Sequence, residues 1–586
     1  MKNDYSISVL RKRLFAICIA ITFLFCFLCG RFFYVQVLWQ ETLTARALDQ
    51  WMREIPLVAE RGLIVDRNGE VLVENDTAYT VYARANAVQD KERTAAVLAQ
   101  ALKIDGAQLL EKLNTVKASE ITVAKRIGKE AIADLTENSL SGVYYSRDNM
   151  RSYPYGELLC QVLGFTSSDN VGSTGIEKYY DKYLSGTNGE LLYQTDLVGV
   201  DLKNAVAAYR PAEDGLSLQL TIDIRMQEIV ENALRKVAEE YSPVSAECIL
   251  LDPNTFEVLA LANYPSYDLN DVPRDDIALL NALSRNRLVS DIYEPGSTFK
   301  VITAAANLEE WLSGNRSAFS PNYIFPSGRT RSVDSTTVKC WNNHANGRHC
   351  NQTLADALNN SCNPCFTDIA MSLGTETFYR YLSAFGFGGT TGLDFSGEAL
   401  GMLLPEGAVR GCDLARIGFG QTVAVTGIQL ACATAAAVNG GKYFTPHIVK
   451  RIYAADGYTE TSVEPSFKRQ VISEEASKLL AEMLEGVVAN GSGKKAYIEG
   501  ARVGGKTGTA QNKGKDHSAF MGFAPMNNPK IAVAVYVENG GWGATYGVPI
   551  GALIMEKYLN GVLSTQSEVK ASDIQMRRID YGVHER

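Results

Sequence analysis

An apolar run near the N-terminus, Leu14 to Gly30, contains seventeen residues without a charged side chain. As a helix rising about 1.5 Å per residue it would be roughly 25 Å long, near the lower limit for crossing a bilayer. Arg31 interrupts the run, but apolar residues continue as far as Val37. An arginine at a helix end can extend its guanidinium group to the lipid headgroups. The sequence therefore predicts one membrane-spanning helix over residues 14–37.

Positive charges directly precede this helix, at Arg11, Lys12 and Arg13. By the positive-inside rule, residues 1–13 form a cytoplasmic tail and the chain after the helix lies outside the cytoplasm. The alternative is a cleaved signal peptide, whose apolar region is usually about 7–15 residues long and ends in small residues. This run is longer and ends in Cys29-Gly30-Arg31, which favours an uncleaved anchor in the cell (plasma) membrane, with a single pass.

The composition of the 586 residues is that of an ordinary globular protein, with 46% hydrophobic and 21% charged residues. This excludes disorder as the main state of the chain. The 57 basic and 66 acidic residues give a net charge of −9, whereas a dedicated nucleic-acid binder would have a basic surface. We expect no nucleic-acid partner.

Turn and strand patterns after the anchor predict a mixed α and β architecture. Residues 61–75 and 248–265 each have two apolar runs around a turn, which is typical of a β-hairpin. A strand is predicted over 217–222 and another over 530–537, with a helix after each. Strands before and after a long middle region of helical pattern indicate an α+β or α/β layered fold.

The first chemically suggestive stretch runs from Glu294 to Lys300, EPGSTFK, and is followed by an apolar helical pattern. This places Ser297 at a helix N-terminus and Lys300 one turn later on the same face. A serine hydroxyl needs a base to become a nucleophile, and a desolvated lysine beside it can serve as that base. The Ser-x-x-Lys pattern is weak by itself, because it also occurs at Ser492 and Ser567.

Two further stretches support the prediction of a catalytic serine from the first stretch. Ser361-Cys362-Asn363 follows a helical run and can direct a hydroxyl and an amide into a cleft. Lys506, Thr507, Gly508 and Thr509 have small neighbours, which suit an edge strand whose backbone approaches a ligand closely. Each of these two stretches has a purely structural explanation, as a loop cap or as a glycine-rich strand. All three stretches in this order, however, occur together by chance far less often than any one of them alone.

Together these stretches resemble the motif set of the penicillin-binding proteins and serine β-lactamases. The resemblance continues outside them. Residues 61–69, RGLIVDRNG, resemble the opening motif of class B, monofunctional penicillin-binding proteins, and Tyr153-Pro154 and Gly175-Ile176-Glu177 resemble their non-catalytic domain. The match covers residues from about 10 to 560.

The resemblance implies a multidomain fold. A non-catalytic pedestal, an elongated mixed domain that resembles a dimerisation domain, would span residues 38–212. A transpeptidase domain with a central antiparallel sheet flanked by helices would span 213–563, and a polar tail 564–586.

The resemblance also implies a peptidoglycan D,D-transpeptidase that needs no metal and no cofactor. Ser297 would attack the bond between the terminal D-alanines of a stem peptide, with Lys300 as base. Ser361 would relay a proton and Asn363 would bind the substrate amide. The remaining roles fall on the third stretch: Lys506 would supply positive charge, Thr507, Gly508 and Thr509 would bind substrate, and the backbone N–H groups of Ser297 and Thr509 would form the oxyanion hole. β-Lactams would acylate Ser297.

One residue departs from the family's pattern: Cys362 occupies the middle position of the Ser-x-Asn motif. Cys340, Cys350 and Cys365 are close in sequence, on the side of the membrane where disulfides persist. One hypothesis is a bond between Cys362 and Cys340 that distorts the site until it is reduced. Unpaired thiols are the alternative, and a zinc site from Cys340, His344, His349 and Cys350 is another.

Three functions therefore remain open. The first is a membrane-anchored transpeptidase, in division, elongation or sporulation, with a polytopic glycan polymerase as partner. The second is a D,D-carboxypeptidase or β-lactamase on the same fold. The third is a catalytically silent or redox-gated scaffold of a wall-synthesis complex.

Overall fold

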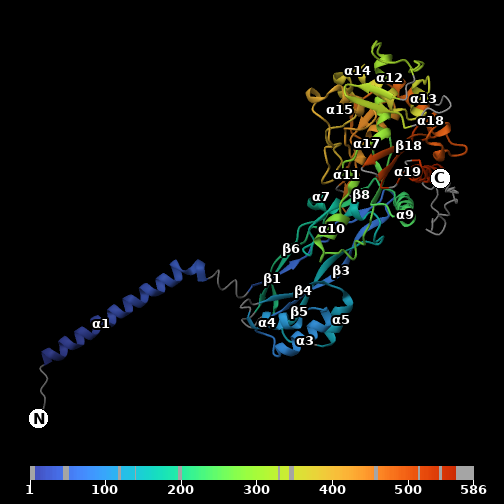
Figure 1. Cartoon of the computed structure of the whole chain (residues 1–586). Helices are drawn as coiled ribbons and strands as arrows, with labels where there is room; N and C mark the ends of the chain where they lie inside the picture. The colour runs from blue at the N-terminus through green and yellow to red at the C-terminus, as the bar shows by residue number, and fades with distance from the viewer. Residues whose placement is uncertain are drawn as a thin grey trace. The chain divides into compact units, whose positions relative to one another are not determined.

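The N-terminal helix is the first element of the computed structural model, which describes residues 7–43, 52–115, 120–138, 140–195, 201–326, 330–341, 349–454, 460–512, 515–539, 541 and 544–561. Helix α1 (Ile7–Phe33) continues into a π-helical turn, η1 (Tyr34–Leu38). Together they form a span that contains 18 consecutive residues of mean hydropathy 2.3, and the span is long and apolar enough to cross a membrane (Figure 1). The predicted helix over 14–37 is present, and the predicted tail over 564–586 lies outside the described residues.

The chain divides into two compact units. The first contains residues 1–59 and 186–214, the second residues 60–185 and 215–586. Besides α1, the first unit has an antiparallel sheet in the order β1-β6-β7. Its strands are β1 (Met52–Leu57), β6 (Gly189–Thr195) and β7 (Asp201–Arg210). The predicted domain boundary between residues 212 and 213 stays a prediction.

The second unit begins with a seven-stranded sheet in the order β15-β14-β8-β2-β3-β4, with β5 also paired to β3. The predicted hairpin over 61–75 forms its centre, because β2 and β3 pair antiparallel around Gly69, whose φ of +92° suits glycine. The strands are β2 (Ile64–Val65), β3 (Val71–Ala83), β4 (Ile121–Ile127), β5 (Val143–Ser152), β8 (Ser217–Leu220), β14 (Val449–Tyr453) and β15 (Glu460–Ser462).

Short helices accompany this sheet. Three of them, α3 (Lys91–Leu102), α4 (Gly106–Thr115) and α5 (Lys129–Glu137), bury a small apolar core against β3 and β4. Next come α6 (Cys160–Leu163), α7 (Gly175–Tyr179) and α8 (Asp181–Leu184). The amphipathic sequence pattern over residues 177–184 predicts a single helix, and this prediction is wrong in one respect. The backbone leaves helical geometry at Tyr180, with φ −103° and ψ 17°, so two short helices form instead.

A buried ion network joins the opening motif to these helices. Arg61 is 1% exposed, and its Nε donates to Glu177 Oε2 over 2.6 Å. Arg151 Nε donates to the other oxygen, Glu177 Oε1, over 2.7 Å. Arg61 Nη1 also donates to Asp181 Oδ1 over 2.7 Å. The carboxylates of Glu177 and Asp181 therefore balance the charges of two guanidinium groups, and the fully buried Glu177 contacts both of them.

Replacing Glu177 by glutamine should destabilise the protein by about 3–5 kcal/mol, because removing one partner of a buried ion pair leaves charges without compensation. Thermal unfolding of both variants measures the effect. Glu157→Gln is the matched control, because Glu157 faces Arg235 over 3.4 Å in an exposed pair, and exposed pairs contribute about 0–1 kcal/mol. Equal unfolding temperatures for the two variants would contradict the assigned role of the network.

The C-terminal part of this unit has a five-stranded antiparallel sheet in the order β10-β9-β19-β18-β17. Its strands are β9 (Ser245–Leu251), β10 (Val258–Tyr264), β17 (Gly504–Asn512), β18 (Lys515–Ala524) and β19 (Ile531–Glu538). Helices α9 (Ile224–Tyr241) and α19 (Gly547–Leu559) contact it in one apolar cluster. The predicted hairpin over 248–265 and the strand over 530–537 are therefore confirmed.

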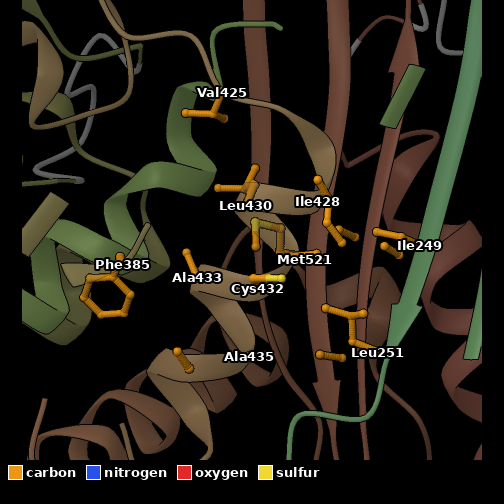
Figure 2. Packing of buried hydrophobic residues seen from close by; sticks show 14 of the residues in the cluster. Ile249, Leu251, Phe385, Val425, Ile428, Leu430, Cys432, Ala433, Ala435 and Met521 are labelled. Atoms are coloured by element: carbon orange, nitrogen blue, oxygen red, sulfur yellow. The ribbon is translucent and has the colours of Figure 1, made fainter. Parts of the chain in front are cut away.

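Helix α17 (Gly427–Val438) also contacts β9, β18 and β19, but in a different cluster, with Cys432 and Leu430 packed near Ile249 and Met521 (Figure 2). Three further helices contact α17: α11 (Arg287–Ser290), α12 (Lys300–Leu312) and α18 (Glu474–Ala489). The other helices of this part of the chain are α10 (Ile277–Leu283), η2 (Gly296–Phe299), α13 (Leu354–Asn359), α14 (Asn363–Leu373), α15 (Thr375–Ala384), η4 (Glu406–Ala408), α16 (Gly411–Ile417) and η5 (Lys494–Ala496).

Two small antiparallel sheets of two strands each are also present, β11 (Thr330–Val333) with β12 (Thr336–Lys339) and β13 (Lys442–Phe444) with β16 (Phe467–Gln470). The α+β layered class is confirmed, with a central antiparallel sheet and flanking helices.

Candidate active site

Ser297 lies in a tight turn at the start of a buried helix. The turn η2 is a 3₁₀ helix, and α12 begins at Lys300, so the α-helix starts three residues later than the sequence pattern indicates. Gly296 has φ +54°, and its N–H donates to Gly420 O over 2.9 Å. A Cβ on Gly420 would lie 2.1 Å from Gly296 O. Close backbone packing against residue 420 therefore holds the serine turn in place.

Lys300 connects the first two motifs. Its side chain is fully buried, and its Nζ lies within hydrogen-bond distance of four oxygens from three residues. These are Ser297 Oγ at 3.0 Å, Ser361 O at 2.8 Å, Ser361 Oγ at 3.0 Å and Asn363 Oδ1 at 2.7 Å. An ammonium group has three hydrogens and cannot donate to all four at once. A neutral amine can donate to two of these oxygens and accept a hydrogen bond from the Ser297 hydroxyl.

The pKa of Lys300 is lowered from 10.5 to about 7, because burial disfavours the charged form. The nearby thiols of Cys362, Cys340 and Cys365 act in the opposite direction and raise this pKa. Near neutral pH a large fraction of the lysine is therefore a free amine within reach of a serine hydroxyl. This is the state that a general base requires.

Ser361 and Asn363 come from the junction between α13 and α14. Ser361 has φ +52° and is 7% exposed, and this left-handed turn brings both its carbonyl and its hydroxyl to Lys300. Asn363 Nδ2 also donates to Lys339 O over 3.4 Å. The structure thus brings together Ser297, Lys300, Ser361 and Asn363.

The third motif lies on β17, the edge strand of the five-stranded sheet. A Cβ on Gly508 would lie 2.9 Å from Thr298 Cγ2 and 3.3 Å from Pro295 O, so the strand packs closely against the serine turn. Lys506 is fully buried. Burial and the charge of Lys300 hold the pKa of Lys506 well below the ordinary value. Among the described residues, Lys506 Nζ donates to Thr507 O over 3.0 Å rather than to Ser361.

Two features near these motifs were not singled out from the sequence as part of the site. Ser492 Oγ lies 2.8 Å from Thr507 Oγ1, in the turn after α18. The Ser-x-x-Lys pattern at Ser492 serves above only as evidence that this motif is weak by itself, yet its serine contacts the third motif. The second feature is Cys365, whose thiol forms a hydrogen bond with the thiol of Cys362. The spacing Cys362-x-x-Cys365 is the signal that could have indicated it.

Cys362 is the centre of a buried sulfur cluster beside Lys300. Hydrogen bonds from Cys340 and Cys365 lower the pKa of the Cys362 thiol. Cys340 Sγ lies 3.3 Å from His349 Nδ1. Of the zinc ligands considered from the sequence, His344 lies outside the described residues, and the described part of the chain contains no group of three or more ligands arranged to hold a metal.

Comparison with known proteins places this geometry in a family. The chain matches the penicillin-binding protein transpeptidase domain over residues 247–558 and the penicillin-binding protein dimerisation domain over residues 56–220. It is 38% identical to stage V sporulation protein D of Bacillus subtilis, over 94% of this chain and 85% of that protein. It is 28% identical to peptidoglycan D,D-transpeptidase FtsI of Escherichia coli, over 94% and 91% of the two chains.

Solved structures show the same fold. A peptidoglycan synthetase from Bifidobacterium adolescentis superposes with a TM-score of 0.69 at 24% identity, over 89% of this chain and 98% of that one. Penicillin-binding protein 2X from Streptococcus thermophilus also gives a TM-score of 0.69, at 22% identity, over 87% and 81%. With its two matched domains and its sporulation and division relatives, the chain belongs to the class B penicillin-binding proteins and carries a serine-type transpeptidase domain.

Proposed function

We propose that this protein cross-links peptidoglycan stem peptides through an acyl-enzyme on Ser297, and that β-lactams acylate the same serine. The observation that carries the proposal is the contact of one buried, partly neutral lysine with Ser297, Ser361 and Asn363. The names of its relatives, which include peptidoglycan D,D-transpeptidases, support the substrate class.

In the acylation step, the Lys300 amine takes the proton of the Ser297 hydroxyl while Oγ attacks the carbonyl of the penultimate D-alanine. The developing oxyanion accepts hydrogen bonds from the backbone N–H groups of Ser297 and Thr509. A donor of this kind contributes about 3–4 kcal/mol in other enzymes. The edge position of β17 and its close packing against the serine turn support this placement of Thr509.

Departure of the terminal D-alanine needs a proton on its nitrogen. Ser361 Oγ lies 3.0 Å from Lys300 Nζ and can pass that proton from the lysine to the leaving amine. Asn363 would bind the substrate amide, and Lys506, Thr507, Gly508 and Thr509 would bind the terminal carboxylate. The amine of a second stem peptide then attacks the acyl-enzyme, and Lys300 takes up the proton of this amine. As the ester bond to Ser297 breaks, Lys300 passes that proton to Ser297 Oγ, which restores the free hydroxyl.

The apolar helix α1 supports anchoring in the cell membrane. The basic residues Arg11, Lys12 and Arg13 favour a cytoplasmic N-terminus, with the catalytic domain on the outside. A transpeptidase needs glycan strands to cross-link, so we expect a polytopic glycan polymerase as its membrane partner.

The products of turnover distinguish a transpeptidase from a carboxypeptidase on the same fold. The full chain in detergent is incubated with lipid-linked disaccharide pentapeptide and a glycan polymerase, and the digested products are separated by mass. We expect cross-linked muropeptides that disappear when penicillin is added. Tetrapeptide monomers as the sole product would identify a carboxypeptidase instead.

A redox control of this site is a second proposal, favoured by the contact between the Cys362 and Cys340 thiols. An external disulfide would take up the two electrons and two protons that the thiols lose as their sulfurs join. Because Cys362 lies between Ser361 and Asn363, the new bond would pull both side chains away from Lys300. Oxidation would then switch off acylation.

Oxidised protein should react with fluorescent penicillin at least about tenfold more slowly than reduced protein, because a misplacement of about 1 Å can cost 10²-fold in rate. The Cys362→Ser variant should lose this redox sensitivity, and Cys432→Ser, which alters a buried thiol on α17, should keep it. Alkylation and peptide mass mapping identify the bonded cysteines. A thiol that remains free at Cys362 after oxidation would contradict the proposal.

A further inference from the structure

A cavity of about 550 Å³ lies in the second unit, away from the three motifs of the active site. Arg126 on β4, Arg151 on β5 and Arg274 in the segment after β10 line it together. Its volume is within the range of small-ligand pockets. Asp76 also lines it, so its charged lining contains three guanidinium groups and one carboxylate.

The hydrogen bonds of Arg151 leave one nitrogen directed to no partner. Its Nε donates to Glu177 and its Nη1 donates to Asn75 Oδ1 over 2.9 Å, but its Nη2 is buried and bonds to no described residue. The side chain of Arg151 is only 2% exposed. The ion network of Glu177 therefore fixes the orientation of this guanidinium group and leaves one N–H edge for another acceptor.

Two more buried donors of the lining are in the same condition. Arg126 Nη2 and the hydroxyl of Tyr153 are both buried, without a hydrogen-bond partner among the described residues. A buried donor without a partner destabilises the fold, and more strongly when it is charged. Three such donors around one cavity indicate that an acceptor normally occupies it.

The positive charge of the cavity is only partly balanced by carboxylates. No described carboxylate lies within 4.0 Å of the guanidinium groups of Arg126 or Arg274, whereas Arg151 shares Glu177 with Arg61. Arg274 Nη2 donates to Thr166 O over 2.8 Å, and its guanidinium group stacks on the ring of Phe165 at 4.9 Å. These contacts hold Arg274 at the cavity without neutralising it. Burial lowers the pKa of Arg126 most, the charge of Asp148 raises it, and the charge of Arg274 lowers it further.

We propose that this cavity binds an oxyanion, a phosphate or a carboxylate group, at a site separate from the Ser297 centre. The planar, forked N–H groups of arginine match the oxygens of either anion. Arg126 and Arg151 bind it from the buried side, Tyr153 donates its hydroxyl, and Arg274 closes the mouth. In a wall enzyme such groups have two sources: the diphosphate of a lipid-linked precursor and the carboxylates of a muropeptide.

Calorimetric titration of the full chain in detergent tests the proposal with three probes. These are inorganic phosphate, inorganic pyrophosphate and N-acetylmuramyl dipeptide, which carries a carboxylate. The variants are Arg126→Gln, Arg274→Gln and the double variant. Arg151 is left intact because its loss would disturb the Glu177 network. Arg147→Gln, on the same strand as Arg151, is the control because it removes an equal charge from a side chain that is 68% exposed.

We expect the wild type and Arg147→Gln to bind at least one probe with the same Kd. Each single variant should weaken binding at least tenfold and the double variant should abolish it, while all of them unfold cooperatively. Binding of pyrophosphate alone assigns the diphosphate source, and binding of the muramyl peptide assigns the carboxylate source. The proposal is overturned if no probe binds the wild type, or if the folded double variant binds as tightly as the control.

Discussion

Replacing Lys300 by alanine is expected to slow acylation of Ser297 by fluorescent penicillin by about 10²–10⁴-fold, the usual contribution of a general base. The reason is geometric as well as electrostatic. The Lys300 amine lies 3.0 Å from Ser297 Oγ, and within the described structure Nζ of Lys300 is the one basic nitrogen bonded to that hydroxyl. Lys478→Ala is the matched control, because it removes an exposed lysine on α18 that belongs to none of the three motifs.

The pH profile of acylation separates this role from a structural one. Lys300 has a pKa of about 7, and only its neutral form can accept a proton. As pH rises through about 7 the neutral fraction grows, so the wild-type rate should increase and then level off at higher pH. The Lys300→Ala variant should keep a slow rate without this rising limb. A variant that stays fast, or that keeps the limb, would remove Lys300 from the role of base.

Much of the fold was predictable because its signals are local. The hairpin over 61–75 needs a turn with a glycine at positive φ, and Gly69 supplies it. The edge strand at Lys506 was predicted from small residues on both sides, and one of them, Gly508, is the position where the serine turn packs against β17. The apolar run over 14–37 likewise determines its helix without help from tertiary contacts.

The arrangement around Lys300 was only partly predictable. Spacing by three residues places Lys300 beside Ser297, but the 3₁₀ geometry of η2 depends on the contact of Gly296 with Gly420, more than a hundred residues away in sequence. The contact of Ser492 with Thr507 depends in the same way on how α18 packs against β17. Tertiary packing decides such contacts, and no local pattern encodes it.

Ser297→Ala tests the central claim most directly. The chain is treated with fluorescent penicillin, and intact mass and peptide mapping locate the adduct. Ser313→Ala is the matched control, a serine at the other end of α12. We predict one penicilloyl group on Ser297 in the wild type and the control, and none in Ser297→Ala. Its cross-linking turnover should fall by up to about 10⁶-fold, as when other serine enzymes lose their nucleophile. An adduct of equal yield on Ser297→Ala would contradict the account, because another residue would then be the nucleophile.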